Sequence, residues 1–231
     1  MNGKLLIIGA LSTIAFSLNA QSAYLTENEN DIYWQPGVQI DFSDYQSPND
    51  EDCLKYNEKY GLVMSSNICF RGVVDIPTKK RKHDKFYIAP VFCKNCSCVL
   101  SEDSLSLKVD RLLFDVAESC TRKARQELLE MQKELNIDNT YTMFFTTVER
   151  KWDEKMRSFW GTIIKDILID KKDSAYISWR NIVDDVLLKT EDYATQPEDC
   201  HRLITKEPIE KGYIMPETIM GDMRSKKEEK E

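Results

Sequence analysis

Apolar and polar residues alternate in three segments near the start of the chain, with a period of two that is typical of β-strands. The first segment, DIYWQPGVQIDFSDY, covers residues 31–45 and contains a Pro-Gly turn. The second covers residues 60–77 and the third covers residues 84–100. The basic run TKKRKHDK between them is expected to be the solvated turn of a hairpin, with a docking patch as the alternative. These segments predict a small antiparallel sheet.

After Ser101 the apolar residues recur at the spacing of an α-helix. The serine and the acidic residues that follow it are typical of a helix N-terminus, and the periodicity continues to about residue 135. A second amphipathic helix is predicted from about Tyr141 to Ile169, and a third from Ser174 to about Lys189. The pattern predicts the α+β fold class, in which a small antiparallel sheet is followed by long amphipathic helices.

The first residues of the chain are typical of a secretory signal peptide. They have a positive charge at Lys4, an apolar run from Leu5 to Phe16 and small residues near Ala20. We expect residues 1–20 to be removed on export to the periplasm or the extracellular space. The apolar run is too short to span a bilayer stably, and no later stretch of the sequence is apolar for long enough to do so.

The C-terminal part of the sequence loses this regular pattern. Periodicity fades beyond Asp192, and the final residues, RSKKEEKE, are charged and have nothing to bury. We therefore expect one domain over residues 21–192. Residues 193–231 are expected to be a C-terminal extension with a charged, disordered tail.

The overall charge restricts the classes of partner. The formal net charge is −7, which argues against binding to nucleic acid because the phosphates of nucleic acid attract basic surfaces. The same charge provides no cationic surface for anionic lipids. With only eight glycines, no glycine-rich phosphate loop and no GxSxG motif, the sequence gives no indication of nucleotide chemistry or of a serine hydrolase.

Cysteines are unusually informative if the chain is exported, because disulfides are the default in an oxidising compartment. The number of cysteines is odd, so at least one thiol is free or pairs with another chain. The sequence leaves the connectivity open. The candidates are Cys53, Cys69, Cys93, Cys96, Cys98, Cys120 and Cys200.

The segment FCKNCSCVL concentrates three of these sulfurs at Cys93, Cys96 and Cys98. We expect them to form disulfides with each other or with the remaining cysteines. In reduced form they are weak candidates for a zinc or copper(I) site, with Cys69 or His83 as a fourth ligand. Thiol redox chemistry is a further alternative, although this CxxC follows a predicted strand and does not open a helix.

The first predicted helix contains LKVDRLLFDVAE, residues 107–118, which has the length and acidic spacing of a metalloprotease helix. Such a helix needs two neutral imidazoles four residues apart and a glutamate that handles the proton of the attacking water. The corresponding positions are Val109, Asp110 and Leu113. Valine and leucine have no lone pairs for a metal, and Asp110 has a shorter side chain than glutamate. We expect no catalytic residue and no bound metal at these positions, and no cofactor in the chain.

The same residues fit a helix of the hydrophobic core. Apolar side chains fall on one helical face, at Val109, Leu112, Leu113, Val116 and Cys120. Two i,i+4 pairs of opposite charge, Arg111 with Asp115 and Glu118 with Arg122, are expected to form salt bridges on the opposite, solvent-facing side.

Three segments, IYWQPGVQIDFSDY, VFCKNCSCVL and LSLKVDRLLFDVAESCTRKARQEL, resemble a family of exported bacterial proteins of unknown function that look like zinc proteases. In that family the helix reads Leu, two residues, His-Glu, two residues, His-Phe-Asp, and then Glu and Arg. The part after the second histidine is matched by Phe114, Asp115, Glu118 and Arg122. The similarity covers roughly residues 31–190, and the helix is its specific part.

The resemblance implies a zincin-like fold that has lost its metal. The chain contains only two histidines, His83 in the basic turn and His201 in the C-terminal extension, so neither replaces a missing ligand of the helix. The expected function is that of a pseudo-protease, an exported protein without catalytic activity that binds a partner protein or a cell-envelope polymer. The alternative function is that of a metal-binding or thiol redox protein that uses the cysteine cluster. An enzyme that uses other carboxylates is a third possibility, but no set of residues supports it.

Overall fold

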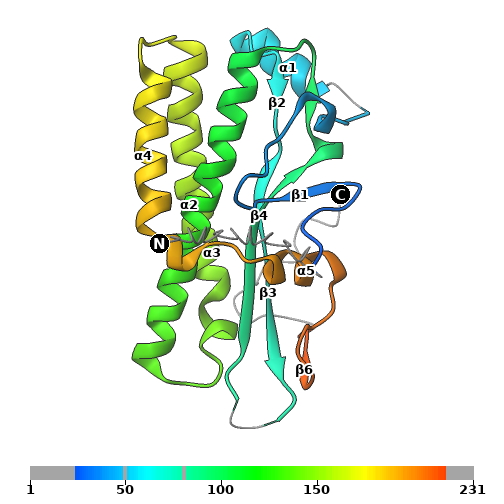
Figure 1. Cartoon of the computed structure of the whole chain (residues 1–231), viewed down its shortest axis with the longest axis vertical. Helices are drawn as coiled ribbons and strands as arrows, with labels where there is room; N and C mark the ends of the chain where they lie inside the picture. Colours follow the sequence, from blue (N-terminus) through cyan, green and yellow to red (C-terminus); the bar gives the residue numbers. More distant parts are fainter. Residues whose placement is uncertain (1–23, 49–50, 80–81, 217–231) are drawn as a thin grey trace, which may run out of the picture.

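The computed structural model describes residues 24–48, 51–79 and 82–216. The predicted signal peptide and the charged tail beyond residue 216 lie outside the described residues. The fold is α+β, as the sequence predicts, with a helical layer packed along a small antiparallel sheet (Figure 1).

The main sheet is built on a long hairpin. Its two strands pair in register from Ile68 opposite Phe92 to Asp75 opposite Lys85, which confirms the predicted hairpin with the basic segment at its turn. The strand order is β1-β4-β3-β6, and all pairs are antiparallel. The strands are β1 (Asp31–Tyr33), β3 (Ile68–Pro77), β4 (Lys85–Cys93) and β6 (Tyr213–Ile214), and a separate pair is formed by β2 (Met64–Ser65) and β5 (Cys98–Val99).

The strand predicted over residues 31–45 is wrong for most of its length, because only Asp31–Tyr33 forms a strand. After Trp34 the chain turns at Gln35–Val38, and Gly37 adopts a positive φ of 83°. Ile40 and Tyr45 then insert into the core beside the first long helix. The alternating apolar residues of this segment are therefore buried from a loop. A short helix, α1 (Glu51–Tyr60), follows, which the apolar pattern did not indicate.

The three helices predicted after Ser101 are present, within a few residues of their expected ends. The helix α2 (Ser104–Leu135) begins two residues later than expected, because the carboxylate of Asp103 accepts a hydrogen bond from the backbone N–H of Ser106. The helix α3 (Thr140–Ile164) continues into a π-helical turn, η3 (Lys165–Ile169), and α4 (Ala175–Lys189) follows it. Figure 1 shows the three helices side by side along the sheet.

Each face of the sheet is covered by a different part of the chain. The residues of β3 and β4 that face the helices pack against α2 and α3, and they form the larger part of the core. The opposite face carries Tyr33, Ala89 and Val91, which pack against Cys200 of α5 (Pro197–Thr205). Since α5 comes from the predicted C-terminal extension, the described part of that extension covers one face of the sheet.

Buried ion pairs hold α5 in place. Arg202 of α5 donates two hydrogen bonds to the carboxylate of Asp75 in β3, at 2.8 and 2.5 Å, and both side chains are only 1% exposed. Arg125 of α2 contacts Asp199 at 3.0 Å and also donates to the carbonyl oxygen of Ile88. These contacts join α5 to both the sheet and the central helix.

Candidate functional site

The helix α2 places the positions of the protease motif in the interior of the protein. The apolar face predicted from the sequence is confirmed, since all five of its side chains are buried in the core. Val109 and Leu113, which stand at the two histidine positions, pack against other apolar side chains. Within the described ranges, no group of three or more His, Cys, Asp or Glu side chains has an arrangement that could hold a metal ion.

The predicted solvent-facing salt bridges of α2 are wrong in two respects. Glu118 and Arg122 do form an ion pair at 2.7 Å, but their side chains are 0% and 6% exposed. Arg111 contacts Asp41 and does not contact Asp115. Asp115 instead accepts hydrogen bonds from the indole N–H of Trp34 at 2.7 Å and from Arg180 at 2.6 Å. From Val109 to Leu128 the helix is covered by the sheet, by α3 and α4 and by the loop after α4, so this stretch has little solvent-facing surface.

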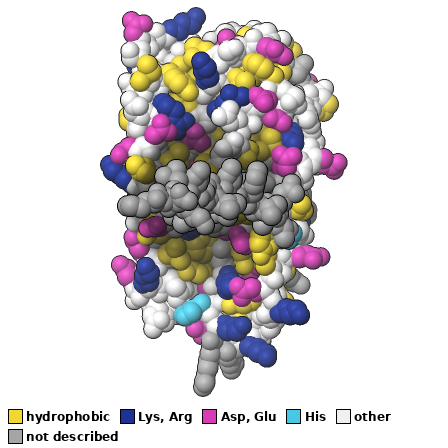
Figure 2. Space-filling model, viewed as in Figure 1, with side chains coloured by type: hydrophobic (Ala, Val, Ile, Leu, Met, Phe, Trp, Pro, Cys, Tyr) yellow, Lys and Arg dark blue, Asp and Glu magenta, His cyan; other side chains and the backbone are white. Residues whose placement is uncertain are grey.

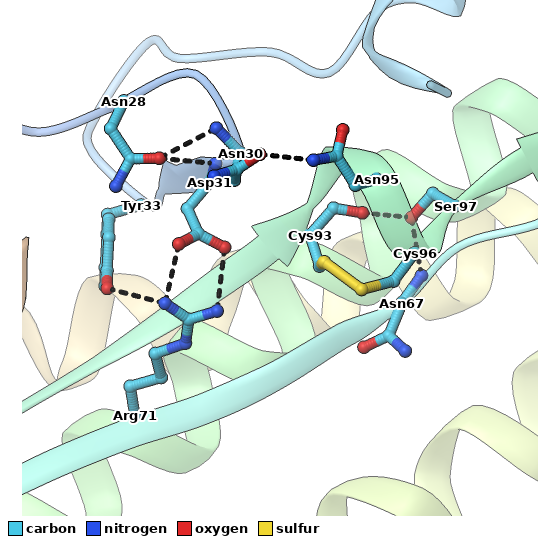
Figure 3. The surroundings of a disulfide bond; sticks show 10 residues. All are labelled: Asn28, Asn30, Asp31, Tyr33, Asn67, Arg71, Cys93, Asn95, Cys96 and Ser97. Carbon is cyan, nitrogen blue, oxygen red and sulfur yellow. Dashed lines mark hydrogen bonds and ion pairs between the residues drawn. A yellow bond between two sulfur atoms is a disulfide. The ribbon is translucent and has the colours of Figure 1, made fainter. Parts of the chain in front are cut away.

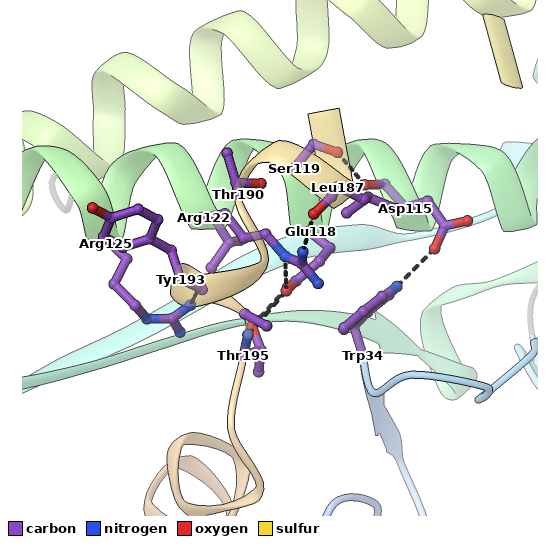
Figure 4. Close-up of polar contacts among 12 residues, drawn as sticks. Trp34, Asp115, Glu118, Ser119, Arg122, Arg125, Leu187, Thr190, Tyr193 and Thr195 are labelled. Atoms are coloured by element: carbon purple, nitrogen blue, oxygen red, sulfur yellow. Dashed lines mark hydrogen bonds and ion pairs between the residues drawn. The ribbon is translucent and has the colours of Figure 1, made fainter. Parts of the chain in front are cut away.

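Glu118 is the centre of a buried hydrogen-bond network (Figure 4). Its carboxylate accepts hydrogen bonds from the backbone N–H and the hydroxyl of Thr195, at 2.9 and 2.6 Å, and from Arg122. Arg122 also donates to the carbonyl oxygen of Leu187 and lies over the ring of Trp34. Burial raises the pKa of the Glu118 carboxyl, although these hydrogen bonds lower it. The network joins α2 to the end of α4 and to the segment before α5.

A cleft of about 410 Å³ lies beside α2, nearer to the N-terminus of the helix than this network. Its walls come from α1, the segment from β2 to the start of β3, α2, α3 and η3. Polar and aromatic side chains line it together with apolar ones, and two of the lining residues are cysteines. These residues include Asp52, Tyr56, Ser66, Asn67, Cys69, Cys96, Asp110, Leu113, Arg157 and Trp160. The volume is in the range of sites that bind small molecules or single segments of a polymer.

Asp110, at the motif position of the catalytic glutamate, lines this cleft but is only 7% exposed. Its carboxylate accepts a 2.6 Å hydrogen bond from the hydroxyl of Tyr45 and another from the side chain of Ser66. Burial raises the pKa of Asp110 to about 6, and the two hydrogen bonds oppose that shift. Sequence reasoning did not identify Tyr45 or Ser66 as site residues, because nothing in the local pattern connects them with a helix residue far along the chain.

The cysteine cluster is divided between two disulfides. Cys53 of α1 is bonded to Cys98 of β5, across a sequence separation of 45 residues. Cys93 is bonded to Cys96 within the CxxC turn (Figure 3). The expectation of disulfides in this cluster is confirmed, and the thiols of Cys69, Cys120 and Cys200 are free. With Cys98 bonded to Cys53, the metal site considered for Cys93, Cys96 and Cys98 does not form in this structure.

The two histidines have different surroundings. His83 lies at the exposed turn of the hairpin beside Gln132, whereas His201 of α5 accepts a hydrogen bond from the backbone N–H of Leu25. Each therefore has a local polar contact, and neither lines the cleft beside Asp110.

The surface seen in Figure 2 has acidic and basic side chains interspersed. No helix among the described residues is long and apolar enough to cross a membrane. No protein-family model, curated protein or solved structure matches this chain. The resemblance to zinc proteases therefore stays a prediction from the sequence motif.

Proposed function

We propose that this chain is an exported pseudo-protease, which has lost its metal ligands and binds a partner protein or a cell-envelope polymer in the cleft beside Asp110. The observation that carries the proposal is the position of this cleft. It lies at the point of α2 where the motif of a zinc protease would place its catalytic residues, and here two of those positions are apolar.

The chemistry of the cleft supports binding without hydrolysis. Peptide hydrolysis by a zinc protease needs a metal ion that polarises the carbonyl group and lowers the pKa of water. Val109 and Leu113 supply no ligand, and the carboxylate of Asp110 already accepts hydrogen bonds from Tyr45 and Ser66. Asp110 then acts as a fixed acceptor that holds Tyr45 and the β2–β3 connection at the wall of the cleft.

The lining supports recognition of a ligand that has both apolar faces and polar groups. Tyr56 and Trp160 provide aromatic surface, and the side chains of Asp52, Asn67 and Arg157 provide acceptors and donors. Segments of a peptide and of a cell-envelope polysaccharide both have this mixed character. The two disulfides support an oxidising compartment, and with it the predicted export.

Binding is tested by calorimetric titration with soluble cell-wall fragments and with a library of extended peptides. Tyr56→Ala and Arg157→Ala are expected to weaken the binding about tenfold or more, because both side chains are solvent-accessible parts of the lining. Tyr60→Ala is the matched control, since Tyr60 is an exposed tyrosine of the same helix α1 that does not line the cleft. Equal losses in Tyr56→Ala and Tyr60→Ala would place the binding surface elsewhere. Zinc-dependent proteolysis that a chelator abolishes would refute the proposal.

A further inference from the structure

The two disulfides differ in their exposure to solvent. Cys96 is exposed and lines the cleft beside Asp110, whereas its partner Cys93 is buried at the end of β4. Both sulfurs of the other disulfide, Cys53 and Cys98, belong to buried residues. A thiolate attacks a disulfide along the line of the bond and needs access to one sulfur. Among the described residues, the cleft gives that access to Cys96 alone.

We propose that the Cys93–Cys96 disulfide is a thiol–disulfide exchange site, whose substrate is a cysteine-bearing peptide segment that enters the cleft. This activity goes beyond binding, and it depends on the exposure of Cys96 and on the cleft, whatever other ligand the cleft accepts.

The backbone around the pair is held by contacts that do not need the disulfide (Figure 3). The N–H of Cys93 donates to the carbonyl oxygen of Asn67, and Cys93 pairs with Asp31 across β1 and β4. The hydroxyl of Ser97 donates to the carbonyl oxygen of Cys93 at 2.7 Å and accepts from the N–H of Asn67 at 2.9 Å. Opening the disulfide therefore leaves β4 and the turn in place, as a reversible exchange site requires.

The free thiols of the chain do not compete for this disulfide. Cys69 is paired with Val91 in the hairpin, so it lies on the same face as Cys93 and also lines the cleft. Burial raises the pKa of the Cys69 thiol, and this keeps it protonated and weakly nucleophilic near neutral pH. Burial raises the pKa of Cys120 and of Cys200 to about 12. The reactive thiolate must come from another molecule.

The exchange is a complete two-electron reaction when the peptide carries two thiols and acts as the reductant. A thiolate of the peptide attacks Sγ of Cys96, which forms a mixed disulfide and breaks the bond to Cys93. The Cys93 thiolate takes up a proton. The second thiol of the peptide then loses its proton and attacks the mixed disulfide, which releases Cys96 as a thiol. The peptide is oxidised to a disulfide by two electrons, and Cys93 and Cys96 are reduced by the same two electrons.

The test uses the full mature chain with both disulfides formed. It is mixed without oxygen, near neutral pH, with about a tenfold excess of a reduced synthetic peptide that carries two cysteines. The free thiols are then alkylated and located by mass spectrometry. The expected result is close to one peptide disulfide formed per chain, with new alkylation at Cys93 and Cys96 and none at Cys53 and Cys98.

Two variants make the result specific. Cys93→Ser with Cys96→Ser should fold, because the turn is held by hydrogen bonds, and should reduce peptide oxidation at least tenfold. Cys200→Ser, which removes a free thiol that does not line the cleft, should leave the peptide oxidation unchanged. The proposal is overturned if the wild-type protein leaves the peptide reduced, if Cys53 and Cys98 are alkylated along with Cys93 and Cys96, or if the double variant oxidises as much peptide as the wild type.

Discussion

The hydroxyl of Tyr45 donates a 2.6 Å hydrogen bond to the carboxylate of Asp110, across 65 residues of sequence. The contact joins a loop that the sequence predicts as a strand to the helix position where a zinc protease would carry its catalytic glutamate. It fixes the carboxylate as a hydrogen-bond acceptor at the wall of the cleft, and burial raises the pKa of that carboxyl to about 6.

Because the pKa of Asp110 is raised, the effect of Asp110→Asn on the stability of the fold should depend on pH. The unfolded chain loses this proton near the ordinary pKa of 3.8 and the folded chain near 6, so the wild type loses stability as pH rises between these values. A difference of about two pKa units corresponds to about 3 kcal/mol at most. Asparagine keeps an acceptor for Tyr45 and does not ionise. The stability of Asp110→Asn relative to the wild type should therefore increase from pH 4 to pH 7.

This is measured by urea unfolding of both proteins across that pH range. Asp52→Asn, which removes an exposed carboxylate from the lining of the same cleft, is the matched control. If the difference in the free energy of unfolding between Asp110→Asn and the wild type does not change with pH, the carboxyl of Asp110 is not held in a desolvated site.

A second prediction concerns the contact between β3 and α3. A Cβ atom added at Gly72 would overlap the ring of Phe145, which is itself buried in the core. Gly72→Ala should destabilise the fold by about 1–3 kcal/mol, as overpacking does. Gly161→Ala, in α3 with nothing near the added atom, should be neutral or stabilise the fold by up to about 1 kcal/mol. Thermal unfolding compares the stability of the two variants. Equal changes in stability for Gly72→Ala and Gly161→Ala would contradict the close approach of Phe145 to Gly72.

A third prediction concerns the ion pair of α5. Arg202→Met leaves the carboxylate of Asp75 buried without its partner, and this should cost about 3–5 kcal/mol. Changing Asp75→Leu in the same chain removes the unpaired charge and should restore part of the loss. Lys189→Met breaks the exposed pair with Asp185 and should cost less than about 1 kcal/mol. If Arg202→Met is as mild as Lys189→Met in urea unfolding, α5 is not part of the folded domain.

The disulfides should contribute unequally to stability. Cys53–Cys98 closes a loop of about 45 residues and joins α1 to β5, which corresponds to about 4 kcal/mol from the entropy of the unfolded chain. Cys93–Cys96 closes only a short turn, for which the same relation gives about 2 kcal/mol. Replacing each pair by serines and measuring the free energy of unfolding tests this order. A larger loss for the CxxC pair would show that it serves as a structural crosslink.

The sequence predicts the helical part of this fold well. The apolar period over α2, α3 and α4 is long enough to be distinguished from other patterns, and tertiary packing did not override it. The segment from Trp34 to Tyr45 was mispredicted because a loop that buries every second side chain has the same alternation as a strand. The salt bridges of α2 were placed in solvent because a helical pattern does not show how many neighbours cover the helix.

The candidate site was predicted only in part. The local motif identifies Asp110, and the CxxC spacing identifies Cys93 and Cys96. Tyr45 reaches Asp110 from a distant segment, and Cys69 lines the cleft from the start of β3. Both contacts depend on tertiary structure, which the spacing of residues along one element does not contain.

Metal content tests the central claim most directly. For this test the protein is produced in a host that exports it to an oxidising compartment. The mature form is purified without chelator or a metal affinity column and analysed by inductively coupled plasma mass spectrometry. With Val109 and Leu113 in the core in place of histidines, we expect far less than one zinc, copper or iron ion per chain. A content close to one zinc per chain, together with proteolysis that a chelator abolishes, would contradict the proposal that this protein is a pseudo-protease.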